Sequence, residues 1–210
     1  DKKVENICPP DIGVKNWNPS AFSPRTGLLY AGVFNSCMDL TDHPVQYIPG
    51  APYDGMEMQR HAGPGGNWGE FIAWDPVAGK RVWSIKEKLY VWSGALATGS
   101  DLVFYGTLDG WFRAVDARSG KVLWSQKVGS SIESQPIAFL GPDKREYIAV
   151  YSGVGGGAGV IRREKGFPPG GNTLYVFSLD GLGIGSGPSQ LTTDAGAAAP
   201  ASVPPAAAHN

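Results

Sequence analysis

The chain repeats one pattern, A-x-D-x-x-x-G-K-x-x-W, at Ala73–Trp83 (AWDPVAGKRVW) and again at Ala114–Trp124 (AVDARSGKVLW). The two copies start 41 residues apart, at positions 73 and 114. Five identities at a single offset favour an internal repeat over two unrelated hairpins that share turn residues. A repeat of about 40–50 residues built from paired strands is typical of β-propeller blades.

Each position of the pattern has a structural reason. The Asp ends a strand and can cap the following turn, and the Gly supplies the positive φ that closes a hairpin. The Trp lies on the next strand, where its ring can pack flat against a neighbouring blade and bury roughly 200 Å². We therefore predict that Trp83 and Trp124 occupy equivalent places on successive blades and serve packing rather than chemistry.

Further stretches of β-branched and aromatic residues surround the repeat and are bounded by turns that contain Gly. These predicted strands are Ala21–Ser23, Leu28–Phe34, Trp92–Thr98, Leu102–Gly106, Gly110–Val115, Ser134–Phe139, Tyr147–Tyr151 and Thr173–Leu179. Together with the repeat they predict an all-β fold, a partial β-propeller of about three to four four-stranded blades.

Two regions do not follow the blade pattern. Residues 41–68 are rich in Pro and Gly and too long for a simple connection, so we predict an irregular excursion between units. Residues 181–210 lose aromatic side chains and consist mainly of Gly, Ala, Pro, Ser and Thr, which predicts a disordered tail. The blades are therefore predicted to occupy residues 1–180.

The bulk composition excludes several classes of partner and location. The 210 residues include 30 Gly and 17 Pro, carry a formal net charge of −1 and show no basic stripe, so nucleic acid is not an expected partner. No apolar run of about 18 residues is present, so we expect no membrane-spanning segment. The sequence begins with Asp1 rather than Met, from which we expect a processed or partial chain.

The chain has two cysteines, Cys8 and Cys37. An even pair in a β protein rich in Gly and Pro is compatible with one disulfide and an oxidising compartment. Two buried free thiols are equally compatible, so the residues alone leave both states open. The three histidines, His43, His61 and His209, have no ligand spacing, and we predict no metal site in this chain.

Several short motifs, taken in their order, resemble the methanol dehydrogenase type of pyrroloquinoline quinone (PQQ)-dependent alcohol dehydrogenases. The repeat resembles the tryptophan-docking motif of their eight-bladed propellers. The other matching stretches are Ile7–Pro9 (ICP), Lys15–Pro19 (KNWNP), Asn35–Asp39 (NSCMD), Val91–Thr98 (VWSGALAT) and Phe104–Gly110 (FYGTLDG). The resemblance covers about residues 5–180, is nearest to the lanthanide-using branch, and is to the C-terminal part of the large subunit.

This resemblance implies alcohol oxidation, with PQQ as cofactor and a Ca²⁺ or lanthanide ion as Lewis acid. In the family the metal ligands and the catalytic Asp lie upstream of the matched region, so this chain is expected to contain neither. The parent protein would be a periplasmic enzyme that oxidises a small alcohol of the methanol or ethanol type and passes electrons to a cytochrome c-type acceptor. The missing N-terminal half of the propeller would be the structural partner of this chain.

The resemblance also assigns residues to the cofactor. Asn16, in the KNWNP stretch, matches an Asn that hydrogen-bonds the polar edge of the quinone, and Trp17 belongs to the same loop. Trp92 matches a Trp beside the PQQ. Gly157, in the run GGGAG at 155–159, stands where the family has a Trp near the cofactor, which is a departure from the family's pattern.

The same resemblance bears on the cysteines, because Cys8 and Cys37 match a pair that forms a structural disulfide in the methanol enzymes. If formed, the bond closes a loop of about 30 residues, for which the chain-entropy model gives roughly 3–4 kcal/mol.

Each assignment has a structural alternative. Asn16 can hold a turn before Pro19, and Trp92 can pack between blades. At the level of function, the alternative is a non-catalytic propeller scaffold, such as an outer-membrane assembly factor, whose blades also repeat Gly and Trp. The Asn16–Trp17 pair and Trp92 distinguish the two, because a scaffold has no need of cofactor contacts.

Overall fold

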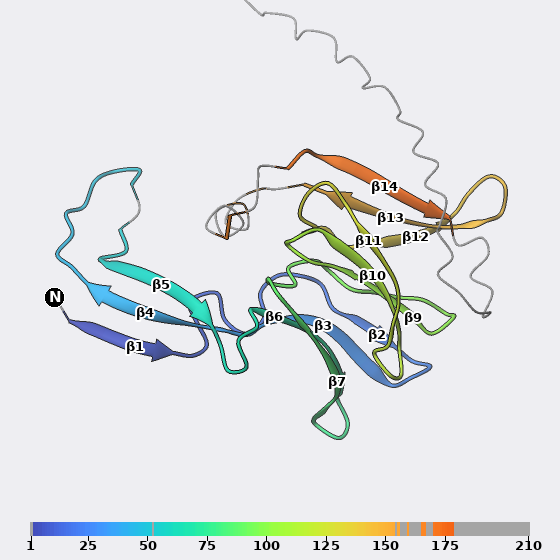
Figure 1. Cartoon of the computed structure of the whole chain (residues 1–210), viewed down its shortest axis with the longest axis horizontal. Helices are drawn as coiled ribbons and strands as arrows, with labels where there is room; N and C mark the ends of the chain where they lie inside the picture. Colours follow the sequence, from blue (N-terminus) through green and yellow to red (C-terminus); the bar gives the residue numbers. More distant parts are fainter. Residues whose placement is uncertain are drawn as a thin grey trace, which may run out of the picture.

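The computed structural model describes residues 2–51, 53–153, 155, 159, 165–166 and 170–178. Their strands form four antiparallel sheets, three of which stack face to face (Figure 1). We name the stacked sheets the first, second and third blades. The predicted all-β fold is confirmed.

The blades follow one another along the chain. The first blade has the order β2-β3-β6-β7, the second β8-β9-β10-β11 and the third β12-β13-β14. Their strands are β2 (Ala21–Ser23), β3 (Leu28–Phe34), β6 (Gly69–Asp75), β7 (Lys80–Glu87), β8 (Leu96–Ala97), β9 (Leu102–Gly106), β10 (Trp111–Asp116), β11 (Val122–Lys127), β12 (Ile137–Leu140), β13 (Glu146–Ser152) and β14 (Thr173–Ser178).

The two copies of the repeat have the same backbone geometry. Ala73 pairs with Trp83 across β6 and β7, and Ala114 pairs with Trp124 across β10 and β11. The register shifts at the next residue in both pairs of strands, so each copy also has the same irregularity. The predicted internal repeat is therefore confirmed at the level of single residue pairs.

The turns of the two copies are closed as predicted. Asp75 Oδ1 accepts hydrogen bonds from the amides of Val77 and Ala78, both at 2.9 Å. The glycines four residues after each Asp have positive φ, 62° at Gly79 and 71° at Gly120. A side chain with a Cβ is strained in this backbone conformation, which explains the Gly in the pattern.

Asp116 accepts corresponding bonds in the second copy. Its Oδ1 accepts from the amide of Arg118 at 3.2 Å and from the amide and hydroxyl of Ser119 at 2.8 and 2.6 Å. The hydroxyl and amide of Ser119 are also the main reason why the pKa of Asp116 is lowered.

The repeat tryptophans pack in the same direction, each towards the following blade. Trp83 lies against Gly120 of the second blade, where an added Cβ would meet the indole ring at 2.7 Å. Trp124 lies with its ring centroid 5.2 Å from that of Phe177 in the third blade. The prediction that the two tryptophans occupy equivalent places is confirmed.

Two apolar clusters hold the stack together. The cluster between the first and second blades includes Tyr30, Phe71, Val103, Tyr105 and Val115. The cluster between the second and third blades includes Phe104, Phe112, Ile148, Val150 and Phe177. The core of this chain therefore lies between sheets, as expected for blades of a propeller.

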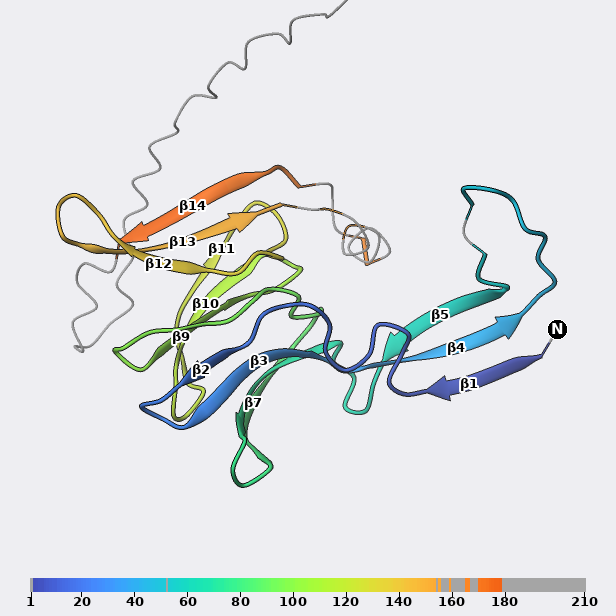
Figure 2. The ribbon, with the colours of Figure 1, turned by 180° about the vertical axis from the view of Figure 1, so that it is seen from behind.

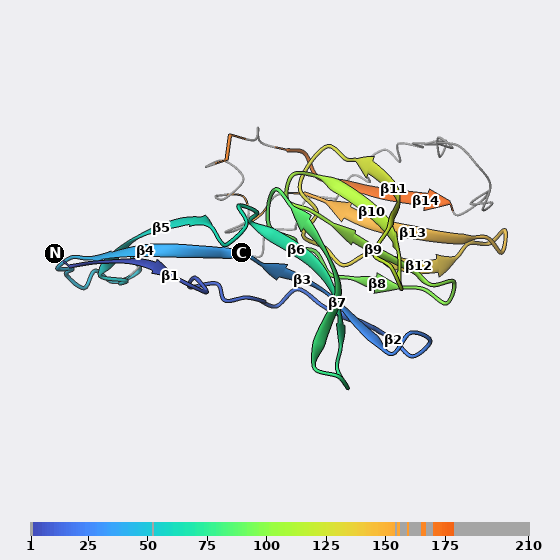
Figure 3. The same cartoon turned by 60° about the horizontal axis from the view of Figure 1, so that its bottom comes forward.

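The fourth sheet forms an arm that extends away from the stack, as two opposite views show (Figures 1 and 2). Its order is β1-β4-β5, with strands β1 (Lys3–Ile7), β4 (Ser36–Asp42) and β5 (Met56–Ala62). The arm projects in the same way when the molecule is turned (Figure 3). We refer to this sheet as the arm.

The prediction of an irregular segment over residues 41–68 is wrong in part. Residues 41–68 are not irregular throughout, because Met56–Ala62 pairs along its whole length with Ser36–Asp42. The pairing is hard to see in the sequence, since the two strands carry polar side chains and are separated by a Pro- and Gly-rich connection. The segment remains an excursion, since it leaves the first blade after β3 and returns at β6.

Cys8 and Cys37 are bonded, with their Cα atoms 4.5 Å apart. The implied disulfide is thus confirmed, and it joins the segment after β1 to β4. It therefore ties the edge strand of the arm to the central strand, in addition to the backbone pairing of Val4 with Leu40.

Two other predictions differ in detail from the structure. The predicted strand Trp92–Thr98 is reduced to Leu96–Ala97, because the residues before it form the connection between blades. The predicted tail, residues 181–210, lies outside the described residues. No helix among the residues that the structure describes has the length and apolar character needed to cross a bilayer.

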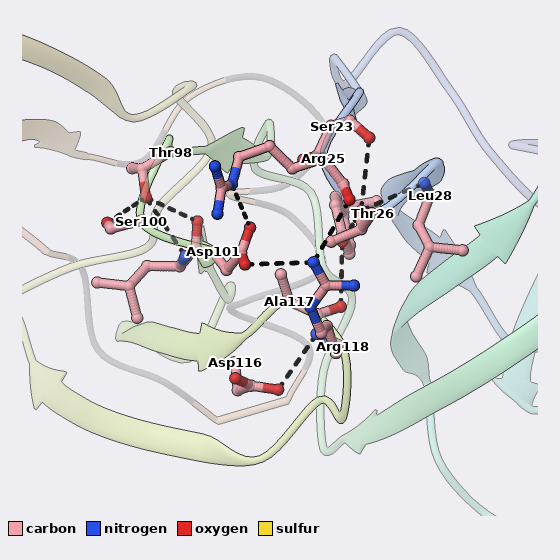
Figure 4. A network of polar contacts seen from close by, with 12 residues as sticks. Ser23, Arg25, Thr26, Leu28, Thr98, Ser100, Asp101, Asp116, Ala117 and Arg118 are labelled. Atoms are coloured by element: carbon pink, nitrogen blue, oxygen red, sulfur yellow. Dashed lines mark hydrogen bonds and ion pairs between the residues drawn. The ribbon is translucent and has the colours of Figure 1, made fainter. Parts of the chain in front are cut away.

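The hairpin turns gather at one end of the blades, where they share a polar network (Figure 4). Asp101 accepts from Arg25 Nε at 3.0 Å and from Arg118 Nη2 at 3.4 Å. Arg25 belongs to a turn of the first blade, and Arg118 to a turn of the second. Because both arginines bind one carboxylate, the network joins two blades at this end.

Candidate functional site

The longer connections lie at the other end of the blades, and backbone hydrogen bonds hold them against one another. Two segments enter a new blade, 8–20 before β2 and 88–95 before β8. The amide of Ala95 donates to the carbonyl of Pro19 at 3.0 Å, and the amide of Phe34 donates to Val14 at 2.7 Å. Segments that are far apart in the sequence therefore form one surface at this end.

Asn18 is the residue that joins the two predicted cofactor segments. Its side chain is fully buried, and its Nδ2 donates to the carbonyls of Gly32 at 3.1 Å and Val91 at 3.5 Å. The loop that carries Asn16 and Trp17 is consequently held beside the segment that carries Trp92. Sequence reasoning missed Asn18, although it follows directly after Asn16–Trp17.

The side chain of Asn16 serves its own loop. Its Nδ2 donates to the carbonyl of Ile12 at 3.2 Å, and its Oδ1 accepts from the amide of Trp17 at 2.8 Å. These bonds correspond to the structural alternative, an Asn that holds a turn. Trp17 next to it has 65% of its surface exposed, which is unusual for an indole that only packs.

Lys15 also fixes the loop that carries Asn16 and Trp17. Its ammonium group donates to the carbonyl of Asn16 at 3.2 Å and to that of Asn18. Partial burial lowers the pKa of Lys15. The carbonyls of Asn16 and Asn18 accept from Lys15, and the backbone amide of Asn16 donates to Asn18 Oδ1. The loop backbone is therefore fixed, while the Trp17 ring stays accessible.

Trp92 lies in an aromatic cluster at this end of the blades. Its ring centroid is 4.9 Å from that of Phe34 and 6.0 Å from that of Tyr90. Only 7% of Trp92 is exposed, and its Nε1 has no hydrogen-bond partner among the residues that the structure describes. An unpaired buried N–H costs about 1–3 kcal/mol, so this donor is suited to an acceptor on a bound molecule.

Glu133 is a further candidate that sequence reasoning did not identify. It lies in the connection before β12 and lines a cavity of about 290 Å³ together with Ser134, Tyr151 and Asn172. The amide of Gly155 donates to its Oε1 at 3.5 Å. Burial raises the pKa of Glu133, and no described residue forms an ion pair with it.

The remaining site predictions concern Gly157 and the metal ligands. Gly157 lies outside the described residues. Among the described residues, no group of three or more His, Cys, Asp or Glu side chains is arranged to hold a metal ion. The upstream position of the metal ligands stays a prediction.

Comparison with known proteins gives one family model that matches part of the chain. Residues 66–148 match "Glucose/ethanol/alcohol dehydrogenase, beta-propeller domain", a PQQ family. This segment includes both copies of the repeat and Trp92.

The chain is also similar to curated proteins over most of its length. It is 44% identical over 202 residues to "Lanthanide-dependent methanol dehydrogenase" of Methylacidiphilum fumariolicum, which covers 84% of this chain and 33% of that protein. It is 44% identical over 154 residues to "Quinoprotein ethanol dehydrogenase" of Pseudomonas aeruginosa, covering 73% of this chain and 25% of the relative. The chain therefore spans about a third or less of the relatives it matches.

A solved structure has the same fold. The chain superimposes on "Europium-containing methanol dehydrogenase" with a TM-score of 0.78 and 44% sequence identity, over 85% of this chain and 35% of that one. The three stacked sheets are thus blades of a partial β-propeller.

Proposed function

We propose that this chain is the C-terminal propeller portion of a PQQ- and metal-dependent alcohol dehydrogenase. Its sequence and fold are similar to methanol dehydrogenases over about a third of their length. In this proposal it contributes one part of the cofactor pocket. The catalytic base and the metal ligands lie in the rest of the parent protein.

The observation that supports the proposal is the arrangement around Trp92. The bonds from Asn18 to Val91 and from Ala95 to Pro19 bring the loop with Trp17 next to Trp92. The site offers a buried N–H donor on Trp92 and an exposed aromatic surface on Trp17. A flat, oxygen-rich quinone can accept from the donor and stack on an indole ring, so these residues fit PQQ.

The chemistry that PQQ supplies when bound is the acceptance of two electrons from an alcohol, with the metal ion as a Lewis acid. The residues of this chain orient the cofactor and exclude water from one side of it. Asn16 acts on the cofactor through the loop geometry, since its own amide groups are engaged with Ile12 and Trp17.

The proposal includes a location and partners. A disulfide between Cys8 and Cys37 suits an oxidising compartment, for which we propose the periplasm. One relative is named "Methanol dehydrogenase [cytochrome c] subunit 1", and by analogy we propose a cytochrome c-type acceptor and a small alcohol as substrate. The remaining blades, including the missing N-terminal half, would complete the ring.

The test is PQQ-dependent dye reduction by the full-length parent with methanol or ethanol, in the presence of Ca²⁺ or a lanthanide ion. We expect activity that needs both the cofactor and the metal, and a loss of PQQ affinity in Trp92→Phe. Trp124→Phe is the matched control, because its ring packs on the cluster between the second and third blades and not in the aromatic cluster of Trp92. A parent without activity under any of these conditions would favour the non-catalytic scaffold.

The isolated 210-residue chain should not oxidise alcohols, because it lacks the metal ligands and the base that the proposal places elsewhere. Weak PQQ binding without turnover is the expected result. Turnover of methanol by the purified chain with PQQ and metal would overturn this division of the site.

A further inference from the structure

A second cavity, which the proposed cofactor site does not use, lies beside the returning segment of the first blade. It has a volume of about 420 Å³ and is lined by Gly65, Gly66, Asn67, Trp68, Lys86, Glu87, Lys88, Leu89 and Lys165. We name it the Lys86 pocket.

The charge of the Lys86 pocket is positive. Lys86, Lys88 and Lys165 line it, and neither Lys86 nor Lys165 has a carboxylate partner among the described residues. Glu87 does not offset them, since its carboxylate is only 5% exposed and binds Arg113 Nε at 2.7 Å. The pocket therefore favours an anion.

The turn at Gly65 and Gly66 lies directly beside the ammonium group of Lys86. Gly65 and Gly66 have positive φ, 89° and 78°, so the turn curves around a small space that holds no side chain of its own. A Cβ at Gly65 would lie 2.8 Å from Lys86 Nζ and 3.4 Å from Asn67 Oδ1. A cation and an acceptor thus border the same point.

Asn67 limits the chemistry of the ligands that the pocket can bind. It is 8% exposed, and its Nδ2 donates to the carbonyl of Gly69 at 2.9 Å and to Glu70 Oε1 at 3.4 Å. Both donor bonds fix the orientation of the amide, and Asn67 Oδ1 is buried with no hydrogen-bond partner in the described part of the chain. A ligand must offer this oxygen an O–H or N–H donor.

Trp68 forms an apolar wall of the pocket. The ammonium group of Lys165 lies 3.7 Å from the centroid of its ring, a cation–π contact that holds this lysine over the cavity. The ring of Trp68 in turn packs on Tyr90 at 5.5 Å. The pocket wall is therefore part of the packed aromatic cluster and not a loose surface loop.

We propose that the Lys86 pocket binds a small phosphate compound that keeps one proton on the phosphate, either the free ion or a monoester. The ammonium groups of Lys86 and Lys165 neutralise its negative charge, and its P–OH group donates to Asn67 Oδ1. Sulfate has the same shape but carries no proton, so it leaves that buried acceptor unpaired. The pocket should therefore discriminate by the proton and not by charge.

The experiment is calorimetric titration of the full chain at pH 6.0 and constant ionic strength with phosphate, sulfate or glycerol 3-phosphate. At this pH inorganic phosphate carries at least one proton, and the monoester carries one on a large fraction of molecules, whereas sulfate is fully ionised. We expect phosphate to bind about tenfold more tightly than sulfate despite its lower charge. Tighter binding of the ester identifies a monoester as ligand, and tighter binding of phosphate identifies the free ion.

The variants test the location. Lys86→Gln and Lys165→Gln should each weaken phosphate binding by about fivefold or more, since each removes a full charge from the pocket. Lys80→Gln is the matched control, because Lys80 begins the same strand, β7, at its far end. Equal binding of sulfate and phosphate, or unchanged binding in Lys86→Gln, would overturn the proposal.

Discussion

The two interfaces between blades are built from the same repeat but with different chemistry. Between the first and second blades, Glu87 binds Arg113 at 2.7 Å and the hydroxyl of Tyr105 at 2.7 Å. Between the second and third blades the contacts are mainly aromatic, with Phe112 and Trp124 packed on Phe177 at 5.5 and 5.2 Å. The repeat places the tryptophans equivalently, whereas residues outside the repeat decide whether an interface is polar.

The same contrast appears at the repeat tryptophans. Trp83 Nε1 donates to the carbonyl of Ala117 at 3.1 Å, and the hydroxyl of Tyr30 donates to the same carbonyl at 3.0 Å. Ala117 follows the Asp of the second copy. The described residues of the third blade end at Ser178, so they include no equivalent of this carbonyl. The first interface is thus fixed by hydrogen bonds that the described part of the second interface does not repeat.

The largest expected effect is at the buried pair of the first interface. Arg113→Leu should lower the free energy of unfolding by about 3–5 kcal/mol, because it leaves the Glu87 carboxylate buried without its cation. Urea unfolding followed by tryptophan fluorescence measures the change. Arg145→Leu, which breaks the exposed pair with Asp143, is the control and should change stability little.

A second substitution sharpens this result. Adding Glu87→Gln to Arg113→Leu should recover part of the loss, because an amide is neutral and its oxygen can still accept from Tyr105. No recovery would mean that Arg113 acts through packing and not through the charge of Glu87.

Next in size are two equivalent glycines, Gly32 of β3 and Gly106 of β9. A Cβ at Gly32 would lie 2.5 Å from the carbonyl oxygen of Val91, and a Cβ at Gly106 would lie 2.3 Å from Ile132 Cγ2. Both Gly→Ala variants should lose about 1–3 kcal/mol through overpacking. Chemical denaturation of the two single variants measures these losses.

Double variants separate the two interfaces. The loss from Gly106→Ala should be smaller in an Ile132→Gly background, because Cγ2 at 2.3 Å and Cβ at 2.4 Å from the new methyl are both removed. The loss from Gly32→Ala should persist in a Val91→Ala background, because the obstacle there is a backbone oxygen. Equal relief in both backgrounds would contradict this difference.

A smaller difference is expected between Trp83→Phe and Trp124→Phe. Both variants keep an aromatic ring between blades, but among the described residues only Trp83→Phe removes a hydrogen bond, the one to Ala117. Trp83→Phe should therefore cost about 1 kcal/mol more, measured as the difference between the two midpoints of unfolding. Equal costs would show that this bond adds nothing beyond ring packing.

The smallest effect concerns Glu133, for which no ion-pair partner exists among the described residues. Burial raises the pKa of Glu133 in the folded chain above its unfolded value, so the folded state holds the proton more tightly. The resulting stabilisation is present below the unfolded pKa, about 4.3, and is lost as pH rises through the folded pKa. Glu133→Gln should remove this fall in stability with rising pH, which thermal unfolding between pH 4 and pH 8 measures. An unchanged pH profile would show that Glu133 is solvated.

Part of the candidate site was readable in the sequence and part was not. The stretch KNWNP and the Trp of VWSGALAT predicted the candidate cofactor loops through a family resemblance, and their role in cofactor binding stays a prediction. Their contact depends on Asn18, which bonds to Gly32 and Val91, 14 and 73 residues away in the sequence. Hydrogen bonds of this range carry no periodic pattern, so the sequence could not predict them. Glu133 had no signal either, because its burial depends on how blades meet.

By itself the sequence determined the blades, because strand alternation, the capping Asp and the Gly of each turn act over a few residues. It therefore placed Asp75, Gly79 and Trp83 correctly, together with their counterparts 41 residues later. Only the tertiary structure decided the pairing of Met56–Ala62 with Ser36–Asp42 and the ion pair of Glu87 with Arg113. Polar strands and single charges look the same in the sequence whether exposed or buried, and their energy depends on which distant neighbours remove them from water.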